Sequence, residues 1–381
     1  MQRWLCAACV AVLLVPVVPV QGVVEESGVD GDAVEIRVAV YTSVVEDYAA
    51  EVERALGDGW VDGGTRYEIT SGVIGRRQVL GHGTPALDTE SFDVLVVPGS
   101  GRPYVDAADP RWRAAVRGFV ADGGGYVGIC GGANLASMGF REQWNVNALL
   151  NVSTLGIANV YVNDQQLEEW QYLWKANWEM GMPPVDVAIL DSGHPIFAGW
   201  SGQRRSMRYG GGPGMYPADG DCAMCGPVVP LAIYVEEPME VAPLHFWRWR
   251  GGWEIAANVT TDVQGQYAAV ASTFGDGRVA LFGPHPEKPT WFGGHVEEFP
   301  VRPRMGPFTW FVYNWSNGTL SSPSYNWWML RRAVVWAAGG VTSPLSAAPR
   351  GWLSVHGRVV LPLPSDVVVG YARRARERWR G

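Results

Sequence analysis

The sequence lacks an excess of positive charge: 30 Lys and Arg stand against 38 Asp and Glu, for a formal net charge of −8. This balance argues against a groove that binds nucleic acid through bulk positive charge, so we expect no nucleic-acid partner. Charged residues are few, at 18%, but 19 Trp, 14 Tyr and 11 Phe exclude an intrinsically disordered chain. The 381 residues are enough to bury a large core without a metal or disulfide.

Long hydrophobic runs are also scarce, and the main one opens the chain. Residues 5–20 are uncharged and mostly apolar, they follow Arg3, and a polar stretch begins near Gly22. The run is short for a membrane-spanning helix, and Pro16 and Pro19 interrupt it. We therefore expect residues 1–22 to be a signal peptide or, if uncleaved, an N-terminal anchor that provides the only membrane contact. Either case predicts an extracytoplasmic protein, secreted or anchored at the outer face of the membrane.

Only five cysteines are present, and two of them, Cys6 and Cys9, lie in that first segment. Cys222 and Cys225 form a CxxC, which predicts a disulfide in an exported chain. A metal half-site is the alternative, but no second CxxC exists to complete it, and we expect no metal. Cys130 is then the odd thiol.

Four N-x-S/T sequons fit an exported chain that is glycosylated on its surface. They begin at Asn151, Asn258, Asn314 and Asn317.

Strand-like and helix-like segments alternate in the first third of the chain. The strands are largely apolar, which is typical of a parallel sheet covered by helices on both faces. We expect strands at 34–42, 65–73, 92–101 and 123–130, and helices at 46–56 and 110–121, the latter capped by Asp109.

The rest of the chain is less regular. Residues 141–260 are rich in Trp and Gly and have few periodic stretches, although strands are possible at 185–197, 206–213 and 231–237. Residues 267–287 predict a hairpin around Gly275, and residues 326–338 predict an amphipathic helix. We expect one domain over 34–340 and a C-terminal extension over 341–381 with a basic end.

The motif that points to chemistry is GICGG, residues 128–132. It follows an apolar strand, and the next residues can begin a helix, which is the pattern of a nucleophile elbow. Small neighbours allow the tight turn that presents Cys130 at the end of the strand. The following helix favours the thiolate, and the N–H of Gly131 can bind a developing oxyanion.

A thiolate nucleophile needs a base, and the segment GPHPE supplies His285 with Glu287 two residues later. His285 follows the strand VALFG at 279–283, and strand ends of a parallel sheet meet over one crevice. Glu287 is positioned to orient the imidazole and stabilise its charge.

These residues carry a resemblance to the class I glutamine amidotransferase superfamily, and within it most closely to the biotin-protein ligase N-terminal domain family. Four segments match in order: VLVVPGSGRPY at 94–104, GGGYVGICGGA at 123–133, RYGGGP at 208–213 and GRVALFGPHPE at 277–287.

The resemblance implies a flavodoxin-like three-layer sandwich with a mostly parallel central sheet. It also implies Cys130 as nucleophile, His285 as base and Glu287 as the residue that orients it. Gly131 and the turn at Gly99 and Ser100 would form the oxyanion hole. Tyr104, Tyr209 and Gly210 would contribute to the pocket.

The sequence also departs from its relatives. Glutaminases of the superfamily typically keep a Gln shortly after the elbow, where this chain has Ala133, Asn134 and Leu135. Cysteine proteases of the superfamily usually have a His directly after the nucleophile, where this chain has Gly131. We expect a cofactor-free thiol hydrolase that cleaves a small-molecule or peptide amide through a thioester. The alternative is a non-catalytic binding or surface protein that retains the fold.

Overall fold

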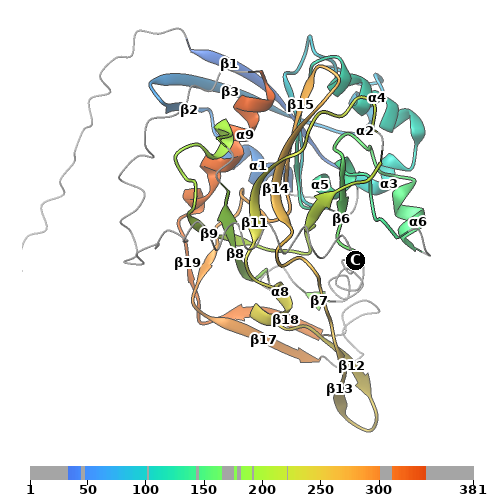
Figure 1. Cartoon of the computed structure of the whole chain (residues 1–381), viewed down its shortest axis with the longest axis vertical. Coiled ribbons are helices and arrows are strands. Elements are labelled where there is room, and N and C mark those ends of the chain that lie inside the picture. The colour runs from blue at the N-terminus through green and yellow to red at the C-terminus, as the bar shows by residue number, and fades with distance from the viewer. Residues whose placement is uncertain are drawn as a thin grey trace, which may run out of the picture.

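The computed structural model describes residues 33–43, 48–100, 103–142, 146–164, 176–177, 182–190, 193–220, 222–300 and 311–339. The expected signal segment and C-terminal extension lie outside these residues. The molecule is built on a twelve-stranded mixed sheet with helices packed on both of its faces (Figure 1).

One half of this sheet is parallel. Its strands, in spatial order, are β3 (Thr65–Ile74), β1 (Val34–Tyr41), β4 (Val94–Val97), β5 (Gly125–Ile129) and β15 (Gly277–Phe282). The short β2 (Gly59–Asp62) runs antiparallel at the edge beside β3. Because β4, β5 and β15 are neighbours, their carboxyl ends open onto the same short stretch of the sheet edge.

The other half is antiparallel. It continues from β15 through β14 (Tyr267–Phe274), β11 (Val229–Tyr234), β8 (Pro184–Ile189) and β9 (Arg204–Arg208). Two further strands, β10 (Met215–Pro217) and β6 (Val160–Val162), branch from β14. The segment at 141–260 thus supplies three strands that extend the main sheet to its second edge.

Successive side chains along the buried strands belong alternately to two cores, one on each face of the sheet. Val38 and Val40 of β1 join the core under α1 (Tyr48–Leu56) and α9 (Trp327–Ala337). Ala39 and Tyr41 join the opposite core. That core packs against α4 (Pro110–Ala121) and α5 (Gly131–Ala136), with α2 (Arg76–Val79), α3 (Pro103–Ala107) and α6 (Val146–Asn151) on the same side (Figure 1).

Two small sheets stand apart from the main one. The hairpin of β12 (His245–Trp249) and β13 (Trp253–Asn258) projects from the body (Figure 1). The other sheet pairs β17 (His295–Pro300) with β18 (Phe311–Ser316) and β7 (Ala176–Asn177). A short ladder of β16 (Trp291–Phe292) and β19 (Thr319–Leu320), the helix α8 (Pro238–Val241), and 3₁₀ turns at Pro195–Phe197 and Pro323–Tyr325 complete the described elements.

The α/β sandwich predicted from the sequence is confirmed, and its parallel strands are those that carry the candidate site. The predicted cap of α4 is present, since the Asp109 carboxylate accepts a hydrogen bond from the N–H of Arg111. The predicted hairpin at 267–287 is β14 and β15, which turn at Gly275 with a φ of 58°. Among the described helices, no stretch is both long and apolar enough to span a membrane.

Candidate active site

Three neighbouring parallel strands bring the predicted catalytic residues together. Gly99 and Ser100 follow β4, Cys130 follows β5, and His285 follows β15 after two further residues. The N–H of Cys130 donates to the carbonyl of Phe282 at 2.7 Å, which extends the pairing of β5 with β15 up to the nucleophile. The cysteine therefore stands at the end of one strand, and the histidine lies just beyond the neighbouring strand, where it pairs with Arg208.

Cys130 has the backbone of a nucleophile elbow. Its φ is 50° and its ψ is −107°, and it stands directly before α5 as the residue that caps it. A positive φ is rare for a residue with a β-carbon and is tolerated where the surroundings enforce it. Cys130 is free and buried, with 7% of its surface exposed.

The glycines around the elbow are required by close packing. A β-carbon on Gly131 would lie 1.9 Å from the carbonyl oxygen of Ser100, and one on Gly132 would lie 2.1 Å from that of Val97. A β-carbon on Gly99 would lie 2.4 Å from Cε1 of His285 and 2.9 Å from Cβ of Cys130. Gly99 thus fills the space between the imidazole and the nucleophile, where no side chain fits.

His285 and Glu287 form a buried pair. Nδ1 of His285 lies 2.6 Å from Oε1 of Glu287, and the two residues are 1% and 4% exposed. Nε2 of His285 is buried and makes no hydrogen bond of ordinary geometry to any described residue. The Cys130 side chain lies next to this ring, since a β-carbon on Gly99 would lie within 3 Å of both Cε1 of His285 and Cβ of Cys130, and the thiol raises the pKa of the imidazole.

The charges in this cluster favour a protonated imidazole. Burial opposes the charged ring, but the Glu287 carboxylate and the Cys130 sulfur outweigh it and raise the pKa of His285 to about 9. Burial likewise opposes the Glu287 carboxylate, yet His285 and then Lys288 lower its pKa below the usual value. At neutral pH the ring is therefore an imidazolium held between a carboxylate and a sulfur.

The glycine run at 208–213 covers the thiol. The Gly210 carbonyl is 3.8 Å from Sγ of Cys130 and accepts its hydrogen bond, and a β-carbon on Gly210 would lie 3.3 Å from Nε2 of His285. A β-carbon on Gly212 would lie 3.3 Å from Cα of Cys130. Met182 packs over Gly210 and was not predicted from the sequence, because it belongs to none of the four motifs.

The expected oxyanion donors lie beside the nucleophile. Gly131 is the first residue of α5, so its N–H has no carbonyl partner within that helix. The backbone of Ser100 packs directly against Gly131. Asn134, in the short helix after the elbow, is fully buried, and its Nδ2 points back to the Cys130 carbonyl at 3.5 Å.

Of the expected pocket residues, Tyr104 and Gly210 reach the site. Tyr104 is 6% exposed, and burial, followed by the nearby Cys130, raises the pKa of its hydroxyl. Tyr209 instead packs into the core, where its ring meets that of Tyr234 edge-on at 6.1 Å.

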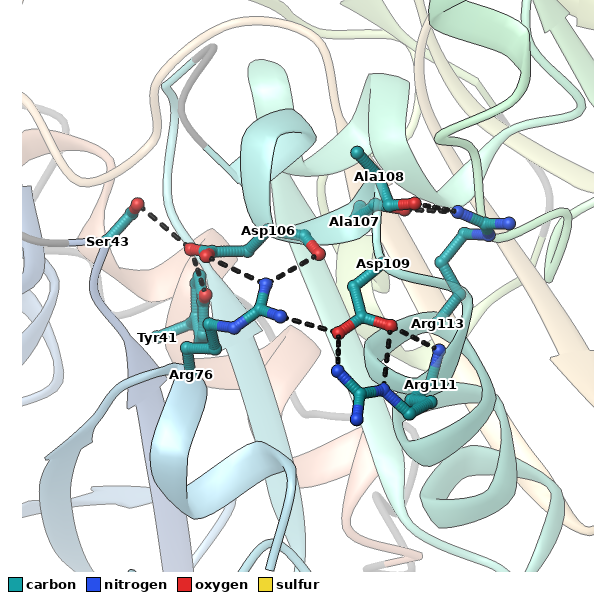
Figure 2. Close-up of polar contacts among 9 residues, drawn as sticks. All are labelled: Tyr41, Ser43, Arg76, Asp106, Ala107, Ala108, Asp109, Arg111 and Arg113. Atoms are coloured by element: carbon teal, nitrogen blue, oxygen red, sulfur yellow. Dashed lines mark hydrogen bonds and ion pairs between the residues drawn. The ribbon is translucent and has the colours of Figure 1, made fainter. Parts of the chain in front are cut away.

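A polar network fixes α3, the helix that carries Tyr104 (Figure 2). The Asp106 carboxylate accepts hydrogen bonds from the hydroxyls of Tyr41 at 2.6 Å and Ser43 at 3.0 Å. Arg76 bridges Asp106 at 3.4 Å and Asp109 at 2.5 Å, which joins α2 to α3 and to the cap of α4. Helix α3 is thus tied to the end of β1, to α2 and to the start of α4.

The remaining predicted residues lie away from the thiol. Cys222 and Cys225 form a disulfide with their Cα atoms 5.2 Å apart. Among the sequons, Asn258 and Asn317 are exposed and Asn314 is half-buried. The Asn151 side chain is committed to the backbone of Phe140, donating at 2.9 Å and accepting at 2.8 Å. Within the described residues, no cluster of His, Cys, Asp and Glu is arranged to hold a metal ion.

Comparisons with known proteins find distant structural likeness. No family model and no curated protein matches the chain. A ThuA-like protein from Parabacteroides merdae is 11% identical with a TM-score of 0.38, covering 84% of this chain and 94% of its own. A glutamine amidotransferase is 15% identical with a TM-score of 0.35, covering 66% and 90%.

A β-galactosidase from Bacillus circulans is 13% identical with a TM-score of 0.33, covering 65% of this chain. The chain spans only 28% of that enzyme's length. At such TM-scores the likeness carries no argument about function.

Proposed function

We propose that the protein is a thiol hydrolase that cleaves an amide bond through a thioester on Cys130. The observation that carries the proposal is the convergence of β4, β5 and β15, which brings Cys130, with its φ of 50°, next to the buried His285–Glu287 pair. Nucleophile, base and orienting carboxylate in this arrangement are the recognised parts of covalent acyl transfer.

The protonation state sets the order of the steps. The proton of Cys130 is held by the His285 imidazolium, so the sulfur attacks the amide carbon as a thiolate, and the carbonyl oxygen takes the negative charge near the N–H of Gly131. The imidazolium gives its proton to the leaving nitrogen, so the C–N bond breaks, the amine departs and a thioester remains. The neutral ring then takes a proton from a water molecule that attacks the thioester; the C–S bond breaks, the carboxylic acid leaves, and the thiolate and imidazolium are restored.

The four segments that resemble the biotin-protein ligase N-terminal domain family meet at this site. They are β4 with its turn, β5 with the elbow, the glycine run, and β15 with the His–Glu pair. This supports the proposal that the chain belongs with that family. We further propose an extracytoplasmic location, which rests on the first 22 residues and the sequons.

The test is to label the full-length protein with a fluorescent iodoacetamide and then screen amides for turnover. We expect labelling at Cys130, and hydrolysis that Cys130→Ala abolishes while the melting temperature stays within a few degrees. Two results together would contradict the hydrolase: none of the amides is cleaved, and Cys130 is labelled no faster than free cysteine.

One observation favours the rival function, a binding protein without turnover. Cys130 is 7% exposed, and the Gly210 carbonyl contacts its sulfur. For turnover, the glycine run has to move aside far enough to admit a carbonyl group to the thiol. A thiol that stays unlabelled in the folded protein and reacts only after denaturation would favour the binding protein.

A further inference from the structure

Arg208 is a buried cation that the proposed mechanism does not use. It is the last residue of β9, its carbonyl accepts the N–H of His285 at 2.9 Å, and two residues later the chain touches the Cys130 sulfur through Gly210. Arg208 itself is 7% exposed. A guanidinium in such a position normally needs a carboxylate or several hydrogen bonds to offset the loss of water.

Arg208 has neither a carboxylate partner nor several hydrogen bonds among the described residues. Its Nη1 donates to the carbonyl of Pro289 at a long 3.3 Å, and its Nε is enclosed without any partner. Its carbon Cζ lies 5.3 Å from the centre of the Trp291 ring. No carboxylate of the described residues is within ion-pair distance, and burial lowers the pKa of Arg208 to about 10.

The nearby carboxylate of Glu51 is already committed. Glu51 raises the pKa of Arg208 only in part, and its Oε2 forms an ion pair with the ammonium of Lys288. Lys288 in turn lies beside the His285–Glu287 pair, where it lowers the pKa of Glu287. Two cations, Arg208 and Lys288, therefore have the one carboxylate of Glu51 between them, and Lys288 holds it.

Two other buried arginines show what a satisfied guanidinium looks like in the same molecule. Arg332 pairs with Asp62 at 2.9 Å and donates to the carbonyl of Ala198 at 2.9 Å. Arg205 donates to Oδ1 of Asn326 at 3.1 Å and to the carbonyl of Tyr325. Arg208 is as buried as these two but lacks their partners, so an anion is the group its surroundings leave out.

We propose that the amide substrate carries an anionic group, a carboxylate or a phosphate, which the guanidinium of Arg208 binds. This inference rests on the proposed hydrolase, since it assigns a substrate class to the same site. A planar guanidinium with free donors binds either oxyanion by charge-assisted hydrogen bonds. The loop from Arg208 to Gly210 then links recognition of the anion to the glycine run that covers the thiol.

The test uses small anions on the full-length protein at constant ionic strength. We expect saturating glutarate, and separately inorganic phosphate, to raise the melting temperature by about 3 °C, whereas neutral glutaramide does not. Arg208→Gln removes the shift and Arg208→Lys keeps part of it. Arg204→Gln is the matched control, because Arg204 lies on the same strand but not beside His285, and it retains the shift. Glutarate without effect, or a shift that survives in Arg208→Gln, overturns the proposal.

A second measurement separates this inference from the function on which it rests. Glutarate should slow labelling of Cys130 by iodoacetamide about tenfold in the wild type but not in Arg208→Gln. Binding of glutarate that depends on Arg208, together with a thiol that never reacts, would refute the hydrolase and leave an anion-binding protein. A reactive thiol that is indifferent to glutarate would keep the hydrolase and refute the anionic substrate. If Arg208→Gln does not fold, the comparison of glutarate with glutaramide on the wild type still decides.

Discussion

Among the described residues, two His–Glu pairs joined through Nδ1 of the ring have nearly the same geometry in very different surroundings. His285 and Glu287 are 2.6 Å apart, and His245 of β12 and Glu298 of β17 are 2.5 Å apart. The side chain of His285 is 1% exposed, whereas that of His245 is 23% exposed. Each pair uses Nδ1 of the ring and one carboxylate oxygen.

The two pairs differ in whether a nucleophile lies next to the histidine. His285 lies at the carboxyl end of a parallel strand whose neighbour ends at Cys130. His245 joins a projecting hairpin to a small mixed sheet, and the free cysteine of the described residues lies elsewhere. A His–Glu contact on its own is therefore structural. Its histidine is a candidate catalytic base only where the sheet also places a nucleophile at the same edge.

The largest expected difference between the pairs is in the dependence of stability on pH. In the unfolded chain His285 has the ordinary pKa near 6.5, and in the folded protein the value is about 9. The folded state therefore binds the proton more tightly, so the stabilisation is complete below pH ~6.5 and is lost as the pH rises through 9. The loss is on the order of 3 kcal/mol.

Guanidinium unfolding of the wild type and His285→Gln between pH 6 and pH 9.5 measures this loss. The difference in unfolding free energy between the two proteins should narrow as the pH rises. His245→Gln serves as the control for removing a His–Glu contact that has no cysteine beside it. A gap for His285→Gln that does not change with pH would contradict a raised pKa in the folded protein.

The next effect concerns the space around each pair. Gly99→Ala would place a β-carbon 2.4 Å from the imidazole of His285, so we expect a loss of about 2 kcal/mol in stability and of most labelling at Cys130. Gly252→Ala, at the tip of the hairpin that carries His245, meets no atom within 4 Å. It should change stability by less than about 0.5 kcal/mol. Equal effects of the two substitutions on thermal unfolding would remove the argument that Gly99 is required by the site.

Much of the core and of the site was predictable because local patterns are strong there. The Asp109–Pro110 start of α4 and the Gly275 turn of the β14–β15 hairpin have recognised sequence signals. Cys130, His285 and Glu287 were found from glycine turns that follow apolar strands, and the structure brings these three residues together.

The rest could not be predicted because it depends on tertiary contacts. Exposed strands such as β17, where half-buried and exposed positions alternate among mixed residue types, give little periodic signal. The antiparallel order of β11, β8 and β9 is a choice of partners that no single strand encodes. Likewise, the sequence shows the glycine run but not that the Gly210 carbonyl lies on the thiol, nor that Arg208 lacks a carboxylate.

A smaller effect is expected on the reactivity of Cys130. His285→Ala removes the imidazolium that stabilises the thiolate, so labelling by iodoacetamide at pH 6 should slow about tenfold. His245→Ala should leave the rate unchanged, since its ring has no contact with the elbow. The rate is read from the loss of free thiol by mass spectrometry, in native protein with intact Cys222–Cys225 disulfide. A rate that is the same in all three proteins would mean that His285 does not act on the sulfur.

The smallest effect is expected at the carboxylates. Glu287→Gln keeps an oxygen near Nδ1 of His285 but removes the charge, so the imidazolium loses one of the two groups that favour it. Because Glu287 acts on the sulfur only through the ring, labelling of Cys130 at pH 6 should slow less than in His285→Ala, by about threefold. In the double variant with His285→Ala, the Gln substitution should add nothing further, and Glu298→Gln should have no effect at all. Equal slowing by Glu287→Gln in the His285→Ala background and in the wild type would mean that Glu287 acts on the thiol by another route. The two His–Glu pairs would then differ for a reason other than the path from carboxylate through imidazole to sulfur.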